Sequence, residues 1–314
     1  MARRKRGFDT SGWIILDKPL EMTSTQAVGK IKWLFNANKA GHAGTLDPLA
    51  TGLLPIALGE ATKTVPFVMD GEKTYRFTVR WGEETDTGDT EGSVVATSPV
   101  RPEAAAIETA LAAFTGDIMQ VPPTYSAIRV DGERAYDRAR DGEEFTLDAR
   151  PVIIYELRLM ECPDADSAIF ECDCGKGTYV RSLARDIALG LGTRGHVTAL
   201  RRLAVGPFGE DDMISLDMLE ELRHKTPDFF EMAFHGQFED VLLPVQIALD
   251  DIPALTVSSK DAVRLKRGQP VLLRGRDAPM ICDTVSVSSD GCLVALGEVD
   301  QGMLKPKRIF NLAR

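Results

Sequence analysis

An aspartate in a glycine-rich stretch has the type and setting of a catalytic residue. Asp47 lies in "GHAGTLDPLATG", residues 41–52. A carboxylate there could act as a nucleophile, since a covalent intermediate divides a difficult step into two easier ones. It could equally begin a helix, because Asp caps free backbone N–H groups and Pro48 suits the first helical position. Apolar residues then follow at helix-like spacing as far as Gly59: Leu49, Leu53, Leu54 and Ala57. On these residues alone the helix start is the favoured interpretation.

An arginine and a tyrosine elsewhere could serve the same chemistry. Arg181, in "GTYVRS", could hold a neighbouring carboxylate in its ionised form. A surface charge is an equally good interpretation of this arginine. Tyr75 belongs to "KTYRFTVRW", residues 73–81, where apolar and polar residues alternate as in a half-buried strand. Since Tyr75 falls on the apolar face, a place in the core is the simpler interpretation.

The segments that would position these residues mix strand and helix patterns. "TSTQ", residues 23–26, is a capping box ahead of a helix that continues through Phe35. Further along, the patterns predict a Gly- and acid-rich loop at 81–92, a strand at 92–97, a helix at 104–114, paired strands at 155–163 and 167–174, a strand that turns into a helix at 177–192, and a strand at 196–208. Without regular βαβ alternation, this order favours an α+β fold.

After about residue 250 the sequence pattern changes to short apolar runs separated by turn residues. Short β-like runs, "PVLLRG", "DTVSVS" and "CLVALGEV", are separated by Gly, Asp and Ser turns. They predict a small β-rich domain over residues 250–314. A second domain also suits the length, because 314 residues exceed the usual size of one hydrophobic core.

Composition excludes several classes of protein. An apolar fraction of 44% and a charged fraction of 27% are typical of a soluble globular protein. No apolar run approaches the roughly 20 residues that span a bilayer, and the run at 13–16 is too short for a signal peptide, so a cytoplasmic location is expected. The five cysteines are odd in number, and the one close pair, Cys172 and Cys174, lacks zinc-ligand partners at useful spacing. We expect free thiols and no metal site.

Charge is unevenly distributed along the chain. The net charge is -10, and the segment 210–251 alone holds twelve acids against two bases. By contrast, the segment 176–208 holds six bases and one acid, and residues 3–6 are all basic. The basic segments could follow a phosphate backbone. A solvated charged face is about as good an interpretation.

Several motifs occur together and in one order: "GWIILDKPLEMTS", "NKAGHAGTLDPLATGLLPIALGEATK", "GEKTYRF", "TDTGDTEG", "PPTYSAIRVDGERAYDRAR", "GKGTYVRSLARDI" and "GHVTALRRLAVGPF". This set closely resembles the bacterial TruB family, the tRNA pseudouridine-55 synthases, over residues 8–208. "LKRGQPV" and "GEVDQGMLKPKRIF" more loosely resemble the PUA-like RNA-binding domain that ends many members. Between 209 and 251 no motif is found.

The resemblance implies a fold, a reaction and a partner. It implies a mixed-sheet pseudouridine-synthase core with flanking helices over 11–245, a basic N-terminal arm over 1–10 and a PUA-like domain over 250–314. The reaction is the isomerisation of uridine 55 in the T loop of tRNA: the base is detached at N1, turned and rejoined through C5, with loss of the C5 proton. No cofactor is needed for it. The expected partner is the T stem-loop of tRNA, and we expect a monomer with no membrane or protein partner.

The resemblance also assigns roles to individual residues. Asp47 becomes the nucleophile and Arg181 its ion-pair partner, while Tyr75 packs against the flipped base and helps remove the C5 proton. Tyr179 and Leu200 match pocket positions, and His42 matches the residue that fills the space left by the flipped base. Lys18 and Asp89 match positions near the site. Whether Asp47 attacks the ribose C1′, attacks the base C6 or acts in a glycal route stays open.

Three readings of the function are in competition. The leading one is a tRNA uridine isomerase, with remodelling of tRNA as an open second role. A related pseudouridine synthase with another RNA target is the second. The third is an RNA-binding or RNA-folding protein that keeps the pocket without chemistry, which the joint presence of Asp47, Tyr75 and Arg181 disfavours.

Overall fold

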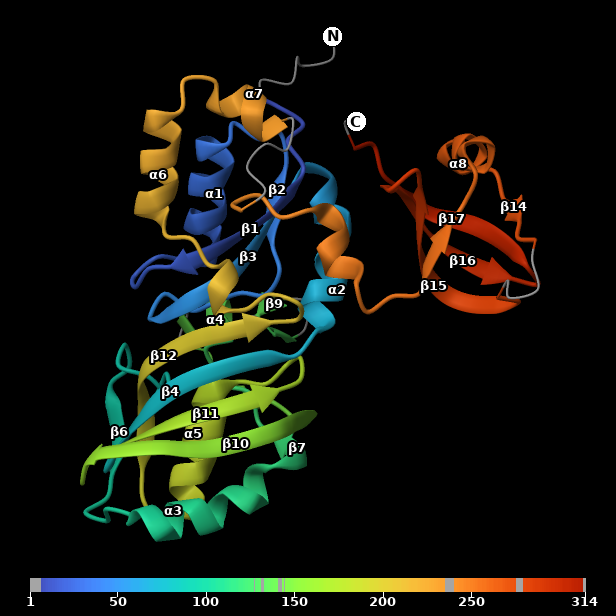
Figure 1. Cartoon of the computed structure of the whole chain (residues 1–314). Helices are drawn as coiled ribbons and strands as arrows, with labels where there is room; N and C mark the ends of the chain where they lie inside the picture. Colours follow the sequence, from blue (N-terminus) through green and yellow to red (C-terminus); the bar gives the residue numbers. More distant parts are fainter. Residues whose placement is uncertain are drawn as a thin grey trace.

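The computed structural model describes residues 7–126, 128–130, 133–140, 143, 145–234, 240–274 and 279–312. A large mixed sheet with flanking helices is followed by a smaller β-rich C-terminal domain, so the expected α+β fold is confirmed (Figure 1). Within the described ranges no helix is long and apolar enough to cross a membrane. The basic residues 3–6 of the expected N-terminal arm lie outside the described residues.

The large sheet brings together strands that are far apart in the sequence. Its order is β1 (Gly12–Lys18), β3 (Ala50–Leu58), β12 (Gly195–Val205), β4 (Lys73–Trp81), β11 (Ser167–Cys174), β10 (Arg150–Asp164) and β7 (Gly116–Gln120), with β2 (Ala40–His42) paired to β3. The pair β12–β3 is parallel, and the other neighbours are antiparallel. Strands β3, β12 and β4 therefore lie side by side at the centre of the sheet.

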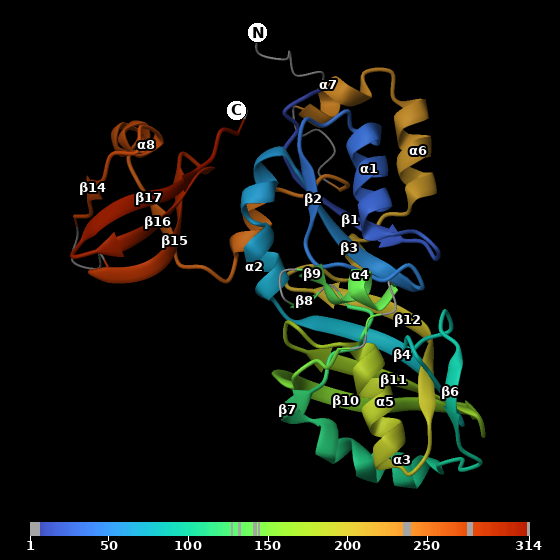
Figure 2. The ribbon, with the colours of Figure 1, turned by 180° about the vertical axis from the view of Figure 1, so that it is seen from behind.

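Helices cover this sheet at both ends (Figures 1 and 2). The α-helices of the large domain are α1 (Ser24–Leu34), α2 (Val65–Asp70), α3 (Ala104–Leu111), α4 (Ala135–Arg140), α5 (Val180–Gly190), α6 (Leu216–Lys225) and α7 (Phe229–Phe234). The shorter 3-10 helices are η1 (Gly59–Lys63), η2 (Ala112–Phe114), η3 (Glu210–Asp212) and η4 (Val245–Leu249). Two short hairpins complete the domain: β5 (Glu83–Thr85) with β6 (Val94–Thr97), and β8 (Arg129–Val130) with β9 (Glu133–Arg134).

Several predicted elements are confirmed. Thr23 caps α1 with the reciprocal capping box that the sequence indicates. Strand β4 covers the predicted residues, and its residues Phe77, Val79 and Trp81 are buried under α5. The predicted strand pair is β10 with β11. At 177–192 the helix is present as α5, but the residues before it form no strand. All five cysteines are free thiols.

The predicted helix start at Asp47 is wrong. Residues 50–58 form strand β3, which pairs with β1 on one side and with β12 on the other. Both faces of β3 are covered, so almost every residue from Leu53 to Leu58 is buried. A strand buried on both faces has a continuous apolar run, which contains matches to helical spacing by accident. Asp47 therefore sits in the loop that leads into a central strand.

Gly52 allows the backbones of the paired strands β3 and β12 to approach closely, because it has no side chain. Its φ is +92°, and a Cβ atom there would lie 2.3 Å from the backbone oxygen of Arg202. We expect Gly52→Ala to lower the free energy of unfolding by at least about 1–3 kcal/mol, the cost of the backbone conformation alone. Urea denaturation measures this change. Gly41→Ala on the neighbouring strand β2 is the control, because a Cβ there meets nothing within 4 Å. Equal stability of the two variants would contradict the prediction.

The C-terminal domain is a five-stranded sheet with one helix. Its strands are β13 (Ala254–Thr256), β15 (Ile281–Ser289), β16 (Cys292–Asp300), β17 (Met303–Ile309) and β14 (Val271–Leu272), in that spatial order. The expected β-rich character is confirmed. The helix α8 (Ser259–Lys266) was not expected. Ser258 caps it, and its residues Ala262 and Leu265 are buried at helical spacing. The helix is short and lies among turn-forming residues, so its pattern did not stand out in the sequence.

The end of β17 fastens this domain to η1. Phe310 is fully buried in a cluster with Ala61 and Val68 of the large domain. The Lys63 ammonium donates to the carbonyl of Ile309 (2.7 Å), and a Glu60 carboxylate oxygen accepts from the Asn311 amide (2.7 Å). Since α2 follows η1 directly, the C-terminal domain is anchored beside α2.

Candidate active site

A cavity of about 590 Å³ opens where the loop before β3, β4, β12 and the start of α5 meet. Five of the residues singled out from the sequence line it: Asp47, Tyr75, Tyr179, Arg181 and Leu200. They come from four separate segments of the chain. The sheet order brings these segments together, because β12 lies between β3 and β4.

Asp47 and Arg181 form an ion pair at this cavity. An Arg181 Nη2 to Asp47 Oδ2 distance of 2.9 Å joins them. The Asp47 side chain is 43% exposed, whereas that of Arg181 is 9% exposed. The Asp47 carboxylate is therefore accessible from the cavity, while the Arg181 guanidinium is buried in the wall. A fixed cation beside a carboxylate is an arrangement that suits a nucleophile.

Arg181 is held from several sides. It lies in the first turn of α5 and donates to the carbonyls of Thr87 (2.8 Å) and Tyr125 (3.0 Å). Asp89 adds a second carboxylate, with an oxygen 3.5 Å from Nη1. Asp89 itself accepts from the Thr87 hydroxyl and the Glu91 amide, so it shapes its turn and also faces Arg181.

The loop that carries Asp47 is tied to its surroundings. Ser24, at the start of α1, exchanges two hydrogen bonds with the backbone of Leu46 (2.9 and 3.0 Å). The Arg202 guanidinium donates to the carbonyl of Gly44 (3.0 Å), and the amide of Ala50 donates to the carbonyl of Asp47 (3.0 Å). These bonds fix the backbone on both sides of the carboxylate, which is what a preorganised site requires.

Tyr75 lies on the cavity wall between two parts of the core. Its ring packs against the hydrophobic clusters on both sides of β12, and Leu200 does the same from the neighbouring strand. Burial raises the pKa of the Tyr75 hydroxyl, and the nearby Arg202 guanidinium opposes that rise through its charge and a polar contact. Tyr75 thus packs against the hydrophobic core and also lines the cavity, so both interpretations made from the sequence hold in part.

The cavity is rich in tyrosine. Tyr179 precedes α5, and its backbone amide donates to the Gln120 side chain (2.8 Å). Burial raises the pKa of the Tyr179 hydroxyl as well. Tyr125 and Tyr136 form an edge-on pair at the same cavity, with ring centroids 6.1 Å apart. Four of the five tyrosines of the chain thus face one cavity, which supplies flat apolar surfaces for a planar ligand.

The sequence reasoning missed Tyr125, Tyr136, Lys73 and Arg202 as cavity residues. Tyr125 and Tyr136 lie in a quoted motif, "PPTYSAIRVDGERAYDRAR", but nothing in their spacing indicates that they face Asp47. Arg202 carried a usable signal. Adjacent residues of a strand point to opposite faces, so one of Arg201 and Arg202 had to point inward. Arg202 is that residue and is 1% exposed.

Two further predicted residues are beside the cavity rather than in its lining. His42 ends β2, and its Nδ1 is buried without a hydrogen-bond partner among the described residues. Burial and the charge of Arg202 lower the pKa of His42. Lys18 ends β1 fully buried, and its ammonium donates to the carbonyls of Pro19 (2.9 Å), Met22 (2.7 Å) and Pro48 (3.3 Å). Lys18 therefore supports the loop that follows Asp47.

Lys18 gives a pH-dependent stability that can be measured. Burial lowers its pKa from 10.5 to about 8, with Asp47 opposing the shift. Between these two values the unfolded chain binds the extra proton, so raising the pH through this window favours the folded state. We expect the free energy of unfolding of the wild type to rise relative to that of Lys18→Met by up to about 3 kcal/mol. Denaturation of both proteins across pH 7 to 10.5 checks this, and a constant difference would contradict it.

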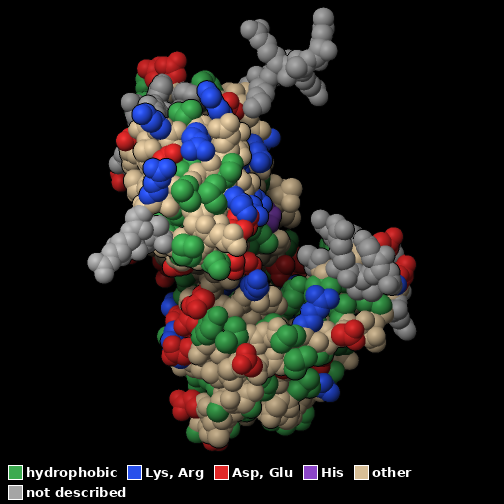
Figure 3. Space-filling view, turned by 90° about the vertical axis from the view of Figure 1, so that its right-hand side faces the viewer, with side chains coloured by type: hydrophobic (Ala, Val, Ile, Leu, Met, Phe, Trp, Pro, Cys, Tyr) green, Lys and Arg blue, Asp and Glu red, His purple; other side chains and the backbone are tan. Residues whose placement is uncertain are grey.

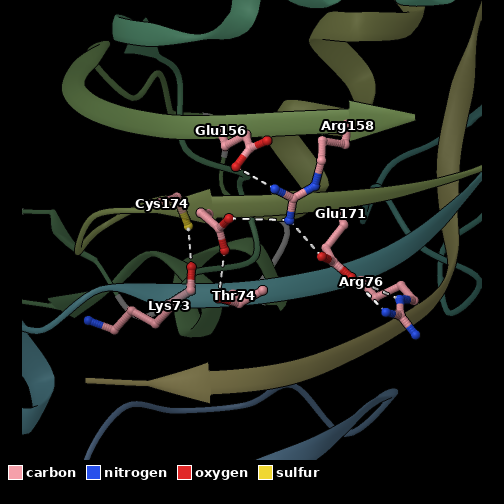
Figure 4. A network of polar contacts seen from close by, with 8 residues as sticks. Lys73, Thr74, Arg76, Glu156, Arg158, Glu171 and Cys174 are labelled. Atoms are coloured by element: carbon pink, nitrogen blue, oxygen red, sulfur yellow. Dashed lines mark hydrogen bonds and ion pairs between the residues drawn. The ribbon is translucent and has the colours of Figure 1, made fainter. Parts of the chain in front are cut away.

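The strands behind Tyr75 are joined on their other face by a polar network (Figure 4). Arg158 on β10 pairs with Glu156 and with Glu171 of β11 (2.7 Å), and Glu171 also pairs with Arg76 of β4 (2.7 Å). Thr74 donates to Asp173 (2.6 Å). These cross-strand bonds fix the register of β4, which carries Tyr75.

Charge is also unevenly distributed in space. On the face in Figure 3, Lys and Arg side chains are prominent over the upper half of the molecule. The acidic segment forms η3, α6 and α7, and α6 packs beside α1 and β1 (Figure 1). At the rim of the cavity Lys176 pairs with Asp70 of α2 (2.9 Å).

Comparisons with known proteins agree with this arrangement. Residues 32–180 match the N-terminal domain model of TruB family pseudouridylate synthases, and residues 181–250 match the C-terminal domain model of tRNA pseudouridylate synthase B. The tRNA pseudouridine synthase B of Bradyrhizobium diazoefficiens is 62% identical over 309 residues, which are 98% of this chain and 88% of that protein. That of Caulobacter vibrioides is 52% identical over 319 residues and covers 99% of this chain and 100% of its own.

A solved structure has the same fold. A chain of a Cbf5-Nop10-Gar1 complex superposes with a TM-score of 0.70 at 24% identity, covering 100% of this chain and 90% of that one. This likeness concerns the fold alone. The family models and the identities to curated relatives together establish that the chain belongs to the TruB family of pseudouridylate synthases.

Proposed function

We propose that this protein isomerises uridine 55 in the T loop of tRNA to pseudouridine, with Asp47 as the nucleophile. Formation of pseudouridine in tRNA is the activity named for relatives that match this chain over almost its whole length. The observation that carries the assignment of the residues is the ion pair between an accessible Asp47 and a buried Arg181 at a tyrosine-lined cavity.

The proposed roles follow from this geometry. Asp47 attacks the nucleotide and so divides the detachment and reattachment of the base into two steps. Arg181 holds the carboxylate at the cavity through the ion pair, and Asp89 holds Arg181 from the other side. Tyr75, which lines the same cavity, removes the C5 proton after the base has rejoined through C5.

The cavity suits a base that has been taken out of an RNA stack. A target base inside folded RNA must be flipped into a pocket before an enzyme can act on it. Splayed RNA bases stack on aromatic side chains and on apolar surface. Tyr75, Tyr179 and Leu200 supply that surface here. We propose that His42, at the end of β2, fills the place that the base leaves, and that Lys18 supports the loop.

The rest of the molecule is proposed to hold the tRNA. The C-terminal domain acts as a PUA-like RNA-binding domain, and the basic stretch 176–208 follows the phosphate backbone of the T arm. We propose a monomeric enzyme of the cytoplasm.

The acidic segment should stay away from the RNA. Its twelve carboxylates would repel phosphates if they faced the tRNA. We expect α6 to be equally open to a chemical probe in free and tRNA-bound protein, whereas the stretch 176–208 becomes protected. Protection of α6 in the complex would contradict this arrangement.

Release of tritium from tRNA labelled at uridine C5 tests the proposed function directly. Wild-type protein should release about one tritium per tRNA, since one C5 proton is lost per isomerised uridine. A tRNA transcript with cytidine at position 55 is the matched control and should release none from that site. Tight binding of tRNA without any release would favour an RNA-binding protein without chemistry. Release that persists from the control transcript would move the reaction to another uridine.

A further inference from the structure

Arg202 is a buried cation that has no carboxylate partner in the part of the chain that the structure describes. Its side chain is among the largest fully buried ones of the protein. It takes part in none of the ion pairs found among the described residues, unlike Arg181 and Arg201. An uncompensated buried charge is costly and is kept where an anion is met during function.

The guanidinium is fixed by two separate segments. Its Nε donates to the carbonyl of Leu53 in β3 (2.8 Å), and Nη2 donates to the carbonyl of Gly44 in the Asp47 loop (3.0 Å). On β12, Arg202 lies directly opposite Tyr75 of β4, and both residues line the same cavity. Tyr75 carries a hydroxyl that can become an anion, so this pair places a buried cation beside a candidate base.

We propose that Arg202 is the positioning residue that holds the Tyr75 oxygen toward the flipped base and stabilises its anionic form as the C5 proton is taken. This rests on the proposed function. In that step the C5–H bond breaks and its electron pair forms the C5–C6 double bond. The N1=C6 double bond of the rejoined base gives its pair to N1, which takes a proton from water, and the Tyr75 oxygen receives the C5 proton. A cation one strand away lowers the cost of the phenolate that must exist beforehand.

Other charged groups surround the Tyr75 hydroxyl. Burial raises the pKa of this hydroxyl, Arg202 opposes the rise, and Cys174 and Asp47 add to it. Lys73, Lys176, Asp70 and Arg181 share the cavity, while Lys18 ends β1 and His42 ends β2. Burial lowers the pKa of Lys18, His42 and Lys73, and the charge of Arg202 contributes to each of these shifts.

The test compares Arg202→Met and Arg202→Lys with the wild type in single-turnover tritium release from pH 6 to 10. Loss of the cation should move the pH of half-maximal release upward by about one unit or more, so the rate near neutrality falls about tenfold and recovers partly at high pH. The lysine variant keeps the charge but not the planar guanidinium. Its pH of half-maximal release should lie between that of the wild type and that of Arg202→Met. Arg101→Met is the control for the profile, because Arg101 pairs with Asp166 and lies outside the segments proposed to bind tRNA or to carry out the chemistry. An unmoved profile in both Arg202 variants would overturn the proposal.

A second readout does not use activity. The tyrosinate absorbance of the wild type minus that of Tyr75→Phe reports the ionisation of Tyr75 itself. We expect this difference to appear at higher pH in the Arg202→Lys background than in the wild type.

If Arg202→Met does not fold, the lysine variant carries the test, and combining it with Tyr75→Phe should add no further loss of rate. Additive losses would mean that Arg202 acts independently of Tyr75. If the wild type releases no tritium, the proposed function fails, whereas the absorbance titration still decides whether Arg202 acts on Tyr75.

Discussion

Replacing Asp47 with asparagine is expected to reduce tritium release by at least about 10⁴-fold, as for the loss of other catalytic nucleophiles. The amide has nearly the same shape and keeps the backbone bond from Ala50, so the loop should stay in place. It is neutral and a poor nucleophile, and it cannot pair with the charge of Arg181. Arg181 remains held by Asp89 and by two backbone carbonyls, so the wall of the cavity is preserved.

Single-turnover tritium release measures this loss, with tRNA affinity measured alongside. Asp211→Asn is the matched control, because it makes the same change at an exposed carboxylate of η3. The control should keep wild-type release. If Asp47→Asn released tritium within about tenfold of the wild type, Asp47 would be a structural residue and the residue assignment would be wrong.

Replacing Tyr75 with phenylalanine is expected to separate binding from chemistry. The ring remains for stacking on a base, so tRNA affinity should stay within a few-fold of the wild type. Loss of the hydroxyl removes the group proposed to take the C5 proton, and such a loss lowers rates by about 10²–10⁴-fold.

The measurement is tritium release at saturating enzyme, with the glycosidic bond followed separately. Tyr75→Phe should still detach the base but release tritium slowly. Tyr155→Phe, at an exposed tyrosine of β10, is the control and should leave both steps unchanged. A parallel loss of both steps in Tyr75→Phe would assign Tyr75 to binding rather than to proton removal.

Local patterns in the sequence predicted the local structure well. Alternation predicted β4 and the side of it on which Tyr75 lies. The capping box at Thr23 predicted the start of α1. These signals depend on residues a few positions apart, which is why one sequence suffices for them.

Two kinds of error have a physical origin. The stretch after Asp47 looked helical because β3 is buried on both faces and lacks the alternation that marks a strand. Arg202 was treated as surface charge because buried arginines are rare. Adjacent residues of a strand point to opposite faces, so Arg201 and Arg202 could not both lie on the same face. In both cases the tertiary surroundings override the local pattern.

The assembly of the site could not come from local patterns. Asp47, Asp89 and Arg181 meet because β12 inserts between β3 and β4, an order that no spacing along the chain encodes. The resemblance to a family grouped these residues in advance. What it did not give is the lining by Tyr125 and Tyr136, or the contacts of Arg202 with the Asp47 loop.

The attachment of the C-terminal domain has a consequence for the size of RNA that the protein can accept. The domain is joined to the large domain at both ends, through the chain after η4 and through Phe310 and Asn311 against η1. A body attached at two points turns only about the line between them. Since α2 continues from η1 and carries Met69 and Asp70 on the cavity wall, one of the two attachment points lies close to the cavity. Under the proposed function, a short RNA strand would contact the cavity alone, whereas a folded tRNA arm of matching length would contact both the cavity and the C-terminal domain.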